Sequence, residues 1–193
     1  MSFYRIGIHR REQFVRRNVR TMLVAYDSRW PEQFRAAAAD IRQATGQDWL
    51  IEHIGSTAVP GLAAKPVIDL AVRVDRPADV GENENALACA GFVDVAAGPR
   101  THRVLVRMSG PERTQIAHFF AATQWDACNQ RIFRDWLLVH PDDRDRYEQV
   151  KRAAAAEARG GRDYTARKTA VIQEIVDRAR ATLGLPQADI WDK

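Results

Sequence analysis

A glycine–serine turn between two strand-like segments constrains this chain more than any other feature. Residues 67–74 read Val-Ile-Asp-Leu-Ala-Val-Arg-Val, a β-branched and mostly apolar run with a proline on each side, which is typical of a buried strand. Residues 49–54 form a second strand-like run, and residues 55–66 between them are rich in small side chains. The pattern predicts two strands joined by a loop that begins with Gly55 and Ser56.

The remaining periodicity predicts an α+β fold, with a mixed β-sheet, flanking helices and a C-terminal helical layer. A length of 193 residues favours a single core. We expect a basic arm over residues 1–22, one folded domain over 23–183 and a tail over 184–193. Within the domain we expect strands at 22–24, 102–108 and 114–121 and helices at 31–44, 78–90, 126–139, 142–158 and 164–183.

Composition excludes several classes of protein. A hydrophobic content of 46% with 28% charged residues is ordinary for a globular protein, so disordered, fibrous and disulfide-framework proteins are excluded. No apolar run is long enough to span a membrane, and no secretory signal is present, so a cytoplasmic location is expected. The net charge of +4 is modest, so nucleic acid is not an expected partner. The basic arm remains open between a solvated extension and an anion-contacting segment.

The turn has the residues that phosphate binding needs. Glycine at position 55 lets the backbone approach a ligand closely, and Ser56 can donate from both its amide and its hydroxyl. Such a turn suits the phosphate tail of a nucleotide such as ATP. Asp69 on the second strand could hold Mg²⁺ beside that tail. The alternative is a tight glycine turn beside a strand whose Asp69 caps a neighbouring segment.

The segment IEHIGSTAVPGLAAKPVIDL, residues 51–70, resembles the signature of the GrpB family, also called UPF0157. Three later segments support the resemblance: 113–118, 133–141 with its Phe-Arg-Asp-Trp-Leu and His-Pro motifs, and the Tyr…Lys pairs within 147–168. The similarity covers about residues 23–180. It implies the fold of the nucleotidyltransferase superfamily, and it implies a reaction less securely than a fold.

The chain departs from that superfamily's pattern of carboxylates. Ala71 stands where a second strand carboxylate is expected, and no carboxylate replaces the third within 102–121. Two metal ions need several carboxylates, so a single Mg²⁺ on Asp69 is the remaining expectation. His118 could act with Asp69 in catalysis as a proton shuttle, since histidine titrates near neutrality, or it could be a core histidine.

Several further side chains are candidates for contacts with the nucleotide. For Arg134 an internal ion pair with Asp135 is the alternative, and for Tyr164 core packing is the alternative. Only four of the 29 basic residues are lysines, and three of them fall inside the matched motifs, so we expect these three to lie nearer Ser56 than most arginines do. The full candidate set is Gly55, Ser56, Thr57, Lys65, Arg103, Arg134, Lys151, Tyr164 and Lys168.

These features favour an enzyme that resembles nucleotidyltransferases. It would use ATP or a related nucleotide with Mg²⁺ to transfer a nucleotidyl group to a small-molecule acceptor. A variant would activate a carboxylate as its adenylate and form an amide. The rival hypothesis is a degenerate member of the fold that binds a nucleotide or a partner protein without chemistry. The oligomeric state stays open.

Overall fold

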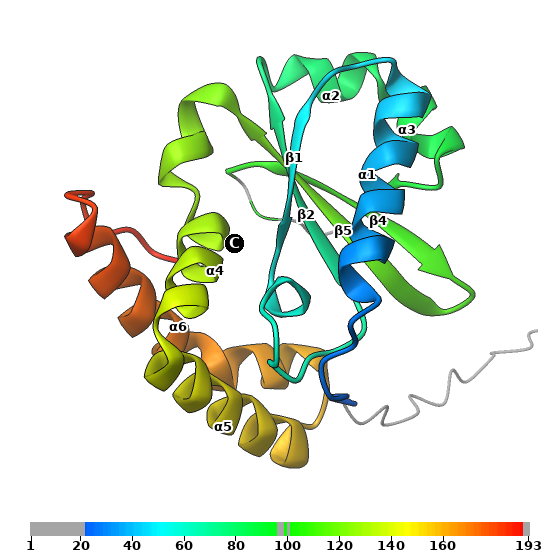
Figure 1. The fold of residues 1–193 in the computed structure, drawn as a ribbon. Coiled ribbons are helices and arrows are strands. Elements are labelled where there is room, and N and C mark those ends of the chain that lie inside the picture. The colour runs from blue at the N-terminus through cyan, green and yellow to red at the C-terminus, as the bar shows by residue number, and fades with distance from the viewer. Residues whose placement is uncertain (1–21, 96–98, 100, 191–193) are drawn as a thin grey trace, which may run out of the picture.

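The computed structural model describes residues 22–95, 99 and 101–190 (Figure 1). The predicted basic arm, apart from Met22, and residues 191–193 of the predicted tail lie outside the described residues. Among the described residues, none of the helices combines the length and the hydropathy that a membrane-spanning segment needs.

A mixed five-stranded sheet forms the centre of the fold, in the order β1-β2-β5-β4-β3. The pair β2–β5 is parallel and the other pairs are antiparallel. The predicted strands are confirmed within two residues, except that 22–24 contributes only a bridge between Val24 and Ala64, and the short β3 was not predicted. The strands are β1 (Leu50–Ile54), β2 (Ile68–Val74), β3 (Val93–Asp94), β4 (Arg103–Ser109) and β5 (Glu112–Ala121).

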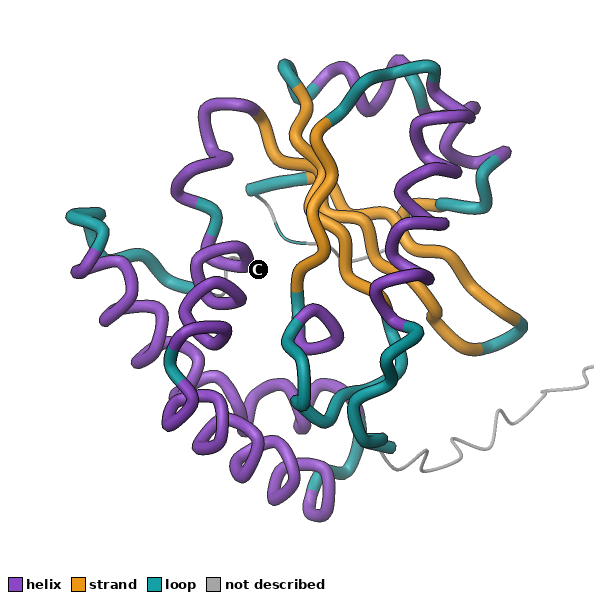
Figure 2. The backbone as a smooth tube through the Cα atoms, viewed as in Figure 1, coloured by secondary structure: helices purple, strands orange, loops and turns teal. Residues whose placement is uncertain are grey.

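The first face of the sheet is covered by α1 (Trp30–Thr45), α2 (Ala78–Glu82) and α3 (Glu84–Cys89) (Figure 2). Alternate residues of β2 point to these helices and build the main core with them, among others Ile68, Leu70 and Val72. The single helix predicted over 78–90 is wrong, because the chain leaves helical geometry at Asn83. The Asn83 side chain donates to the carbonyl oxygen of Asp79 at 2.8 Å, a local bond that competes with helix continuation.

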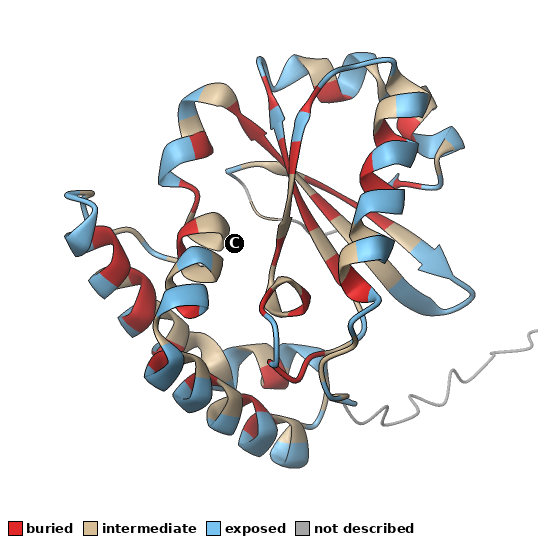
Figure 3. Cartoon of the chain, viewed as in Figure 1, coloured by how far each residue is buried: buried red, intermediate tan, exposed pale blue. Residues whose placement is uncertain are grey.

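The second face of the sheet looks toward η2 (Ala122–Ala127) and the C-terminal layer of α4 (Asn129–Val139), α5 (Pro141–Glu157) and α6 (Gly161–Thr182). This helical layer is confirmed, with its breaks at the predicted His-Pro and Gly-Gly sites. The loop that follows β1 begins with η1 (Ser56–Ala58) and packs on the layer through Val59 and Leu62. Figure 3 shows buried residues on the sheet-facing sides of the helices and on the loop. The glycine–serine turn is therefore enclosed by elements that lie about ninety residues further along the chain.

Candidate functional site

Strand register places the candidate residues in two rows on the second face. Directly paired residues project to the same side of a sheet. One row runs from Ile54 through Asp69 to Ile116. The next row runs from Glu52 through Ala71 to His118. The positions beside Asp69 that could complete a set of metal ligands are thus filled by Ala71 and by Ile116, both apolar.

The turn at Gly55 is built against the carboxylate of Asp69. Gly55 has φ +72°, in the left-handed region that favours glycine. A Cβ atom at this position would overlap Asp69 Oδ2 and lie 3.0 Å from Cγ. The absence of a side chain at residue 55 therefore lets Asp69 lie directly against the turn. The structure thus confirms that the turn and the strand carboxylate lie close together.

Three lysines lie near the turn, and we call Lys65, Lys151 and Lys168 the lysine cluster. Lys151 and Lys168 act electrostatically on Asp69, and Lys65 acts on Lys168. Lys65 and Lys168 both lie on the ring of Tyr164, with Nζ 4.5 Å and 4.2 Å from its centroid. Lys151 is 1% exposed and donates from Nζ to the carbonyl oxygen of Ala63 in the turn's own loop. Through these contacts the lysine cluster connects the loop after β1 with helices α5 and α6.

Burial sets the charge states of this site. It raises the pKa of Asp69 to about 7, although Lys168, Arg113 and Lys151 act to lower it. Burial lowers the pKa of Lys151 to about 7, with the charge of Lys168 acting in the same direction. Burial also lowers the pKa of Lys168 to about 8, assisted by Lys65. The positive charges of Lys151 and Lys168 are thus incompletely neutralised, which is the condition in which an incoming anion is stabilised.

Two members of the site were not among the predicted residues. Arg113, at the start of β5, acts electrostatically on both Asp69 and Lys65. Tyr147 on α5 is 3% exposed, and burial raises its pKa to about 12, although the Ser56 side chain acts to lower it. Lys151 Nζ lies 5.1 Å from the Tyr147 ring. Both residues fall in segments that carry the family resemblance, which was the signal available in the sequence.

Thr57 does not serve as a phosphate contact. Its side chain is 1% exposed, and its hydroxyl donates to the carbonyl oxygen of Val67 at 3.2 Å. Its oxygen also lies 3.0 Å from Nε2 of His53. The hydroxyl is therefore used inside the protein, where it ties the beginning of the loop to its end.

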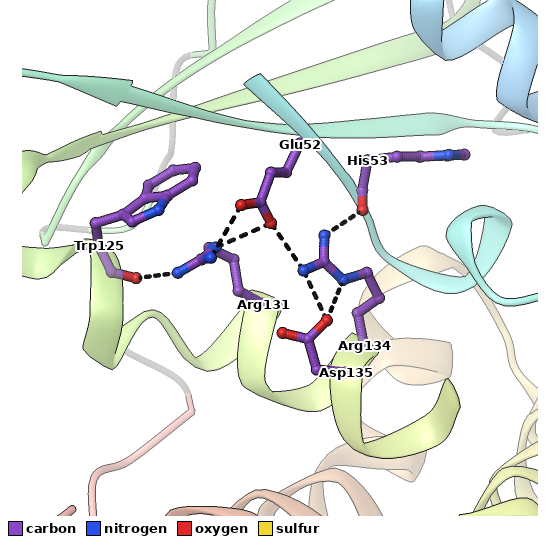
Figure 4. Close-up of polar contacts among 6 residues, drawn as sticks. All are labelled: Glu52, His53, Trp125, Arg131, Arg134 and Asp135. Atoms are coloured by element: carbon purple, nitrogen blue, oxygen red, sulfur yellow. Dashed lines mark hydrogen bonds and ion pairs between the residues drawn. The ribbon is translucent and has the colours of Figure 1, made fainter. Parts of the chain in front are cut away.

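The prediction for Arg134 as a phosphate contact is also wrong, because all its nitrogens are engaged (Figure 4). Nε donates to Asp135 at 2.7 Å, Nη1 to the carbonyl oxygen of His53 at 2.8 Å, and Nη2 to Glu52 at 2.7 Å. Arg131 donates to the same Glu52 carboxylate at 2.9 Å. Burial tends to raise the pKa of Glu52, but the hydrogen bonds from the two arginines outweigh it and the pKa is lowered. These residues fasten α4 to β1.

We expect Glu52→Gln to lower the free energy of unfolding by about 2–4 kcal/mol, because it removes the carboxylate charge that two largely buried guanidinium groups share. Chemical denaturation at pH 7 measures this. Glu174→Gln is the matched control, since Glu174 also accepts from an arginine, Arg146, but is 51% exposed, and the expected loss there is below about 1 kcal/mol. Equal losses in the two variants would contradict a structural role for the Glu52 pair.

Arg103 lies on the first face of the sheet, away from Asp69, so its prediction as a phosphate contact is wrong. Its Nε donates to Asp94 at 3.0 Å and its Nη2 to Glu84 at 2.8 Å. Residues 103 and 105 of β4 share a face, and Leu105 belongs to the main core on the α1 side. The side chain of Arg103 therefore ties β4 to β3 and α3.

His118 lies on the second face but its nearest polar partner is another histidine. His102 Nε2 and His118 Nδ1 are 2.9 Å apart. Burial lowers the pKa of His118 to about 3, with the charges of His102 and Arg113 acting in the same direction. The imidazole is therefore neutral at pH 7, so the expectation that it titrates near neutrality is wrong.

A two-ion metal centre does not fit the residues at the turn. Among the described residues, no group of three His, Cys, Asp or Glu side chains could hold a metal ion. Glu52, which faces Ala71, has both carboxylate oxygens committed to arginines. One carboxylate together with substrate phosphates is often enough to hold a single Mg²⁺, and Asp69 is the carboxylate that lies against the turn.

Comparison with known proteins gives consistent results across sequence and structure. The family model described as GrpB protein matches residues 20–178. A UPF0157 protein of Halalkalibacterium halodurans is 38% identical over 169 residues, which cover 86% of this chain and 85% of that protein. A UPF0157 protein of Streptomyces coelicolor is 39% identical over 160 residues, covering 81% of this chain and 82% of the relative. Conserved protein GrpB from Enterococcus faecalis superimposes with a TM-score of 0.75 at 28% identity, covering 84% of this chain and 99% of that one.

Proposed function

The chain belongs to the GrpB family, and from this premise we propose that it binds the phosphate chain of ATP or a related nucleotide at Gly55 and Ser56 and transfers a nucleotidyl group to a small acceptor. The convergence of the lysine cluster on the Gly55–Asp69 contact is the observation that carries this proposal. Fixed cations beside a glycine turn are the groups that stabilise phosphate charge.

The lysines supply positive charge near Asp69, whereas the strand positions that could hold additional metal-binding carboxylates are occupied by Ala71 and Ile116. Lys151, Lys168 and Arg113 act electrostatically on Asp69, and Lys65 lies with Lys168 over the ring of Tyr164. A triphosphate chain bound among these cations would attract each of them and offset their mutual repulsion. The buried lysines would then favour their protonated forms. Mg²⁺ carried in by the nucleotide would meet Asp69 and would offset part of the phosphate charge.

Asp69 has the chemistry of a general base for such a transfer. A carboxylate with a pKa of about 7 is poised to accept a proton at the working pH. An acceptor hydroxyl would pass its proton to Asp69 as its oxygen forms a bond to the α-phosphorus. The bond between that phosphorus and the bridging oxygen breaks, and pyrophosphate leaves. A carboxylate acceptor would form an adenylate by the same bond changes without the proton transfer, which is the first half of amide formation.

We expect Lys168→Met to weaken ATP binding by about 10- to 100-fold, because a charged hydrogen-bonding partner is worth roughly 1.5–3 kcal/mol. Calorimetry with ATP, with and without Mg²⁺, measures the affinity. Arg167→Met is the matched control, since Arg167 is the preceding residue on α6 and pairs with Glu157 and Asp163 at the surface. Similar affinities for the wild-type protein and for Lys168→Met would contradict the proposal.

Release of pyrophosphate separates the enzyme from a protein that only binds. The wild-type protein is incubated with labelled ATP, Mg²⁺ and a panel of small alcohols, amines and carboxylates. The transferase predicts acceptor-dependent release of pyrophosphate. Lysine-dependent ATP binding without release of pyrophosphate or AMP for any acceptor would favour the degenerate binding protein.

A further inference from the structure

A second hollow lies on the same face of the sheet and is distinct from the lysine cluster. It has a volume of about 460 Å³ and lies between residues 99, 101 and 102, strand β5, η2, the beginning of α4, the C-terminal end of α6 and residues 188–190. Its walls include His102, Phe120, Gln124, Cys128, Arg180 and Ile190. A hollow of this size falls within the range that small-molecule sites occupy in proteins.

Arg180 places a buried positive charge at the wall of this cavity. The residue is 4% exposed, yet among the described residues it has no ion pair with a carboxylate. Nε donates to the carbonyl oxygen of Pro186 at 2.6 Å, and Nη1 to Ala127 at 3.0 Å and to Asn129 Oδ1 at 2.7 Å. Nη2 makes none of these bonds. A buried guanidinium held only by neutral oxygens is expected to attract an anion at its remaining edge.

The opposite wall is aromatic. His102 stacks on Phe120 with ring centroids 4.2 Å apart and an interplanar angle of 29°. His118, which also lines the cavity, is neutral at pH 7 because burial depresses its pKa to about 3. The described lining also includes the carboxylate of Asp189, which partly offsets the positive charge of Arg180, so the cavity suits one carboxylate better than a phosphate dianion. The aromatic pair is a platform for a flat, apolar body.

We propose that this cavity binds a small organic carboxylate with a flat apolar body, whose carboxylate meets Arg180 and whose body lies against His102 and Phe120. The site is separate from the proposed nucleotide site. Arg180 lies twelve residues after Lys168 on α6, a separation of roughly 18 Å along the helix axis. The carboxylate held by Arg180 is therefore an anchoring group and not the atom that would meet a nucleotide at Asp69.

Binding of 2-naphthoate, with 2-naphthamide as its neutral counterpart, tests the proposal in the absence of any nucleotide. We expect naphthoate to shift the amide NMR signals of Thr101, Gln124 and Arg180 and to bind more tightly than naphthamide by about tenfold or more. Arg180→Gln removes the charge and is expected to weaken naphthoate binding by about tenfold while leaving naphthamide binding unchanged. ATP at saturating concentration is expected to leave naphthoate binding in place.

A second variant, which retains Arg180 and fills the cavity, tests the proposal if Arg180→Gln fails to fold. Ala127→Phe fills the cavity wall and leaves the main-chain oxygen that Arg180 uses, so it is expected to abolish binding of both probes while the protein stays folded. Equal affinity for naphthoate and naphthamide would overturn the proposal. So would the absence of binding up to about 10 mM, which corresponds to roughly −3 kcal/mol, or shifts confined to the lysine cluster. Failure of ATP binding has no bearing on these outcomes, which therefore separate this proposal from the proposed nucleotide function.

Discussion

Gly55→Ala is expected to lower the free energy of unfolding by about 3–5 kcal/mol and to abolish nucleotide binding. Two physical effects add in this variant. The backbone at φ +72° becomes strained with any side chain, and the new methyl group collides with Asp69 Oδ2. The neighbour is a strand side chain and cannot withdraw without moving from the turn. Urea denaturation and ATP calorimetry measure the two losses.

Gly61→Ala separates the strain from the collision. Gly61 lies in the same loop and has φ +80°, but a Cβ atom there would meet nothing within 4 Å. We therefore expect this control to lose only about 1–2 kcal/mol and to keep its affinity for ATP. Losses of equal size in the two variants would mean that the contact between Gly55 and Asp69 contributes nothing beyond backbone strain to stability or to ATP affinity.

The sheet was largely predictable because its signals are local. The run 67–74 is β-branched and mostly apolar, and a proline lies on each side of it. The break of the helix at Asn83 was not predictable from periodicity, because it depends on one side-chain hydrogen bond to Asp79. The strand β3 is two residues long and is defined by its pairing with β4. The local sequence does not indicate this pairing.

The phosphate contacts could not be predicted from the type of a charged residue alone. Arg103 and Arg134 have the chemistry of phosphate contacts, but each is engaged by carboxylates that are distant in the sequence or placed by the register of the sheet. Phosphate binding was assigned from residue type, whereas availability depends on what each nitrogen already contacts. The prediction for the lysines rested instead on their rarity in an arginine-rich chain, and Lys151 and Lys168 act electrostatically on Asp69 in the structure. The cavity at Arg180 was not foreseen, since its walls come from segments scattered between residues 99 and 190.

Asp69→Asn is expected to stabilise the protein while abolishing its function. The pKa of Asp69 is raised from 3.8 to about 7 in the folded state, so between about pH 4 and pH 7 the folded protein holds a proton that the unfolded chain has released. The contribution of Asp69 to stability therefore falls as the pH rises through this window and stays low above it. At pH 8 we expect the variant to exceed the wild-type protein by about 1–3 kcal/mol, and at pH 4 we expect the two to be equal.

Thermal and urea unfolding across pH 4–8, with nucleotidyl transfer assayed on the same samples, tests this linkage. Asp75→Asn is the matched control, because Asp75 is exposed just beyond the end of the same strand. We expect Asp75→Asn to change neither the pH profile nor the activity. A carboxylate whose removal stabilises the fold costs the protein stability. Such a cost is expected where the carboxylate has a chemical role. If Asp69→Asn instead destabilises the protein at pH 8, the carboxylate is a structural partner of the lysine cluster, and its assignment as the general base is wrong.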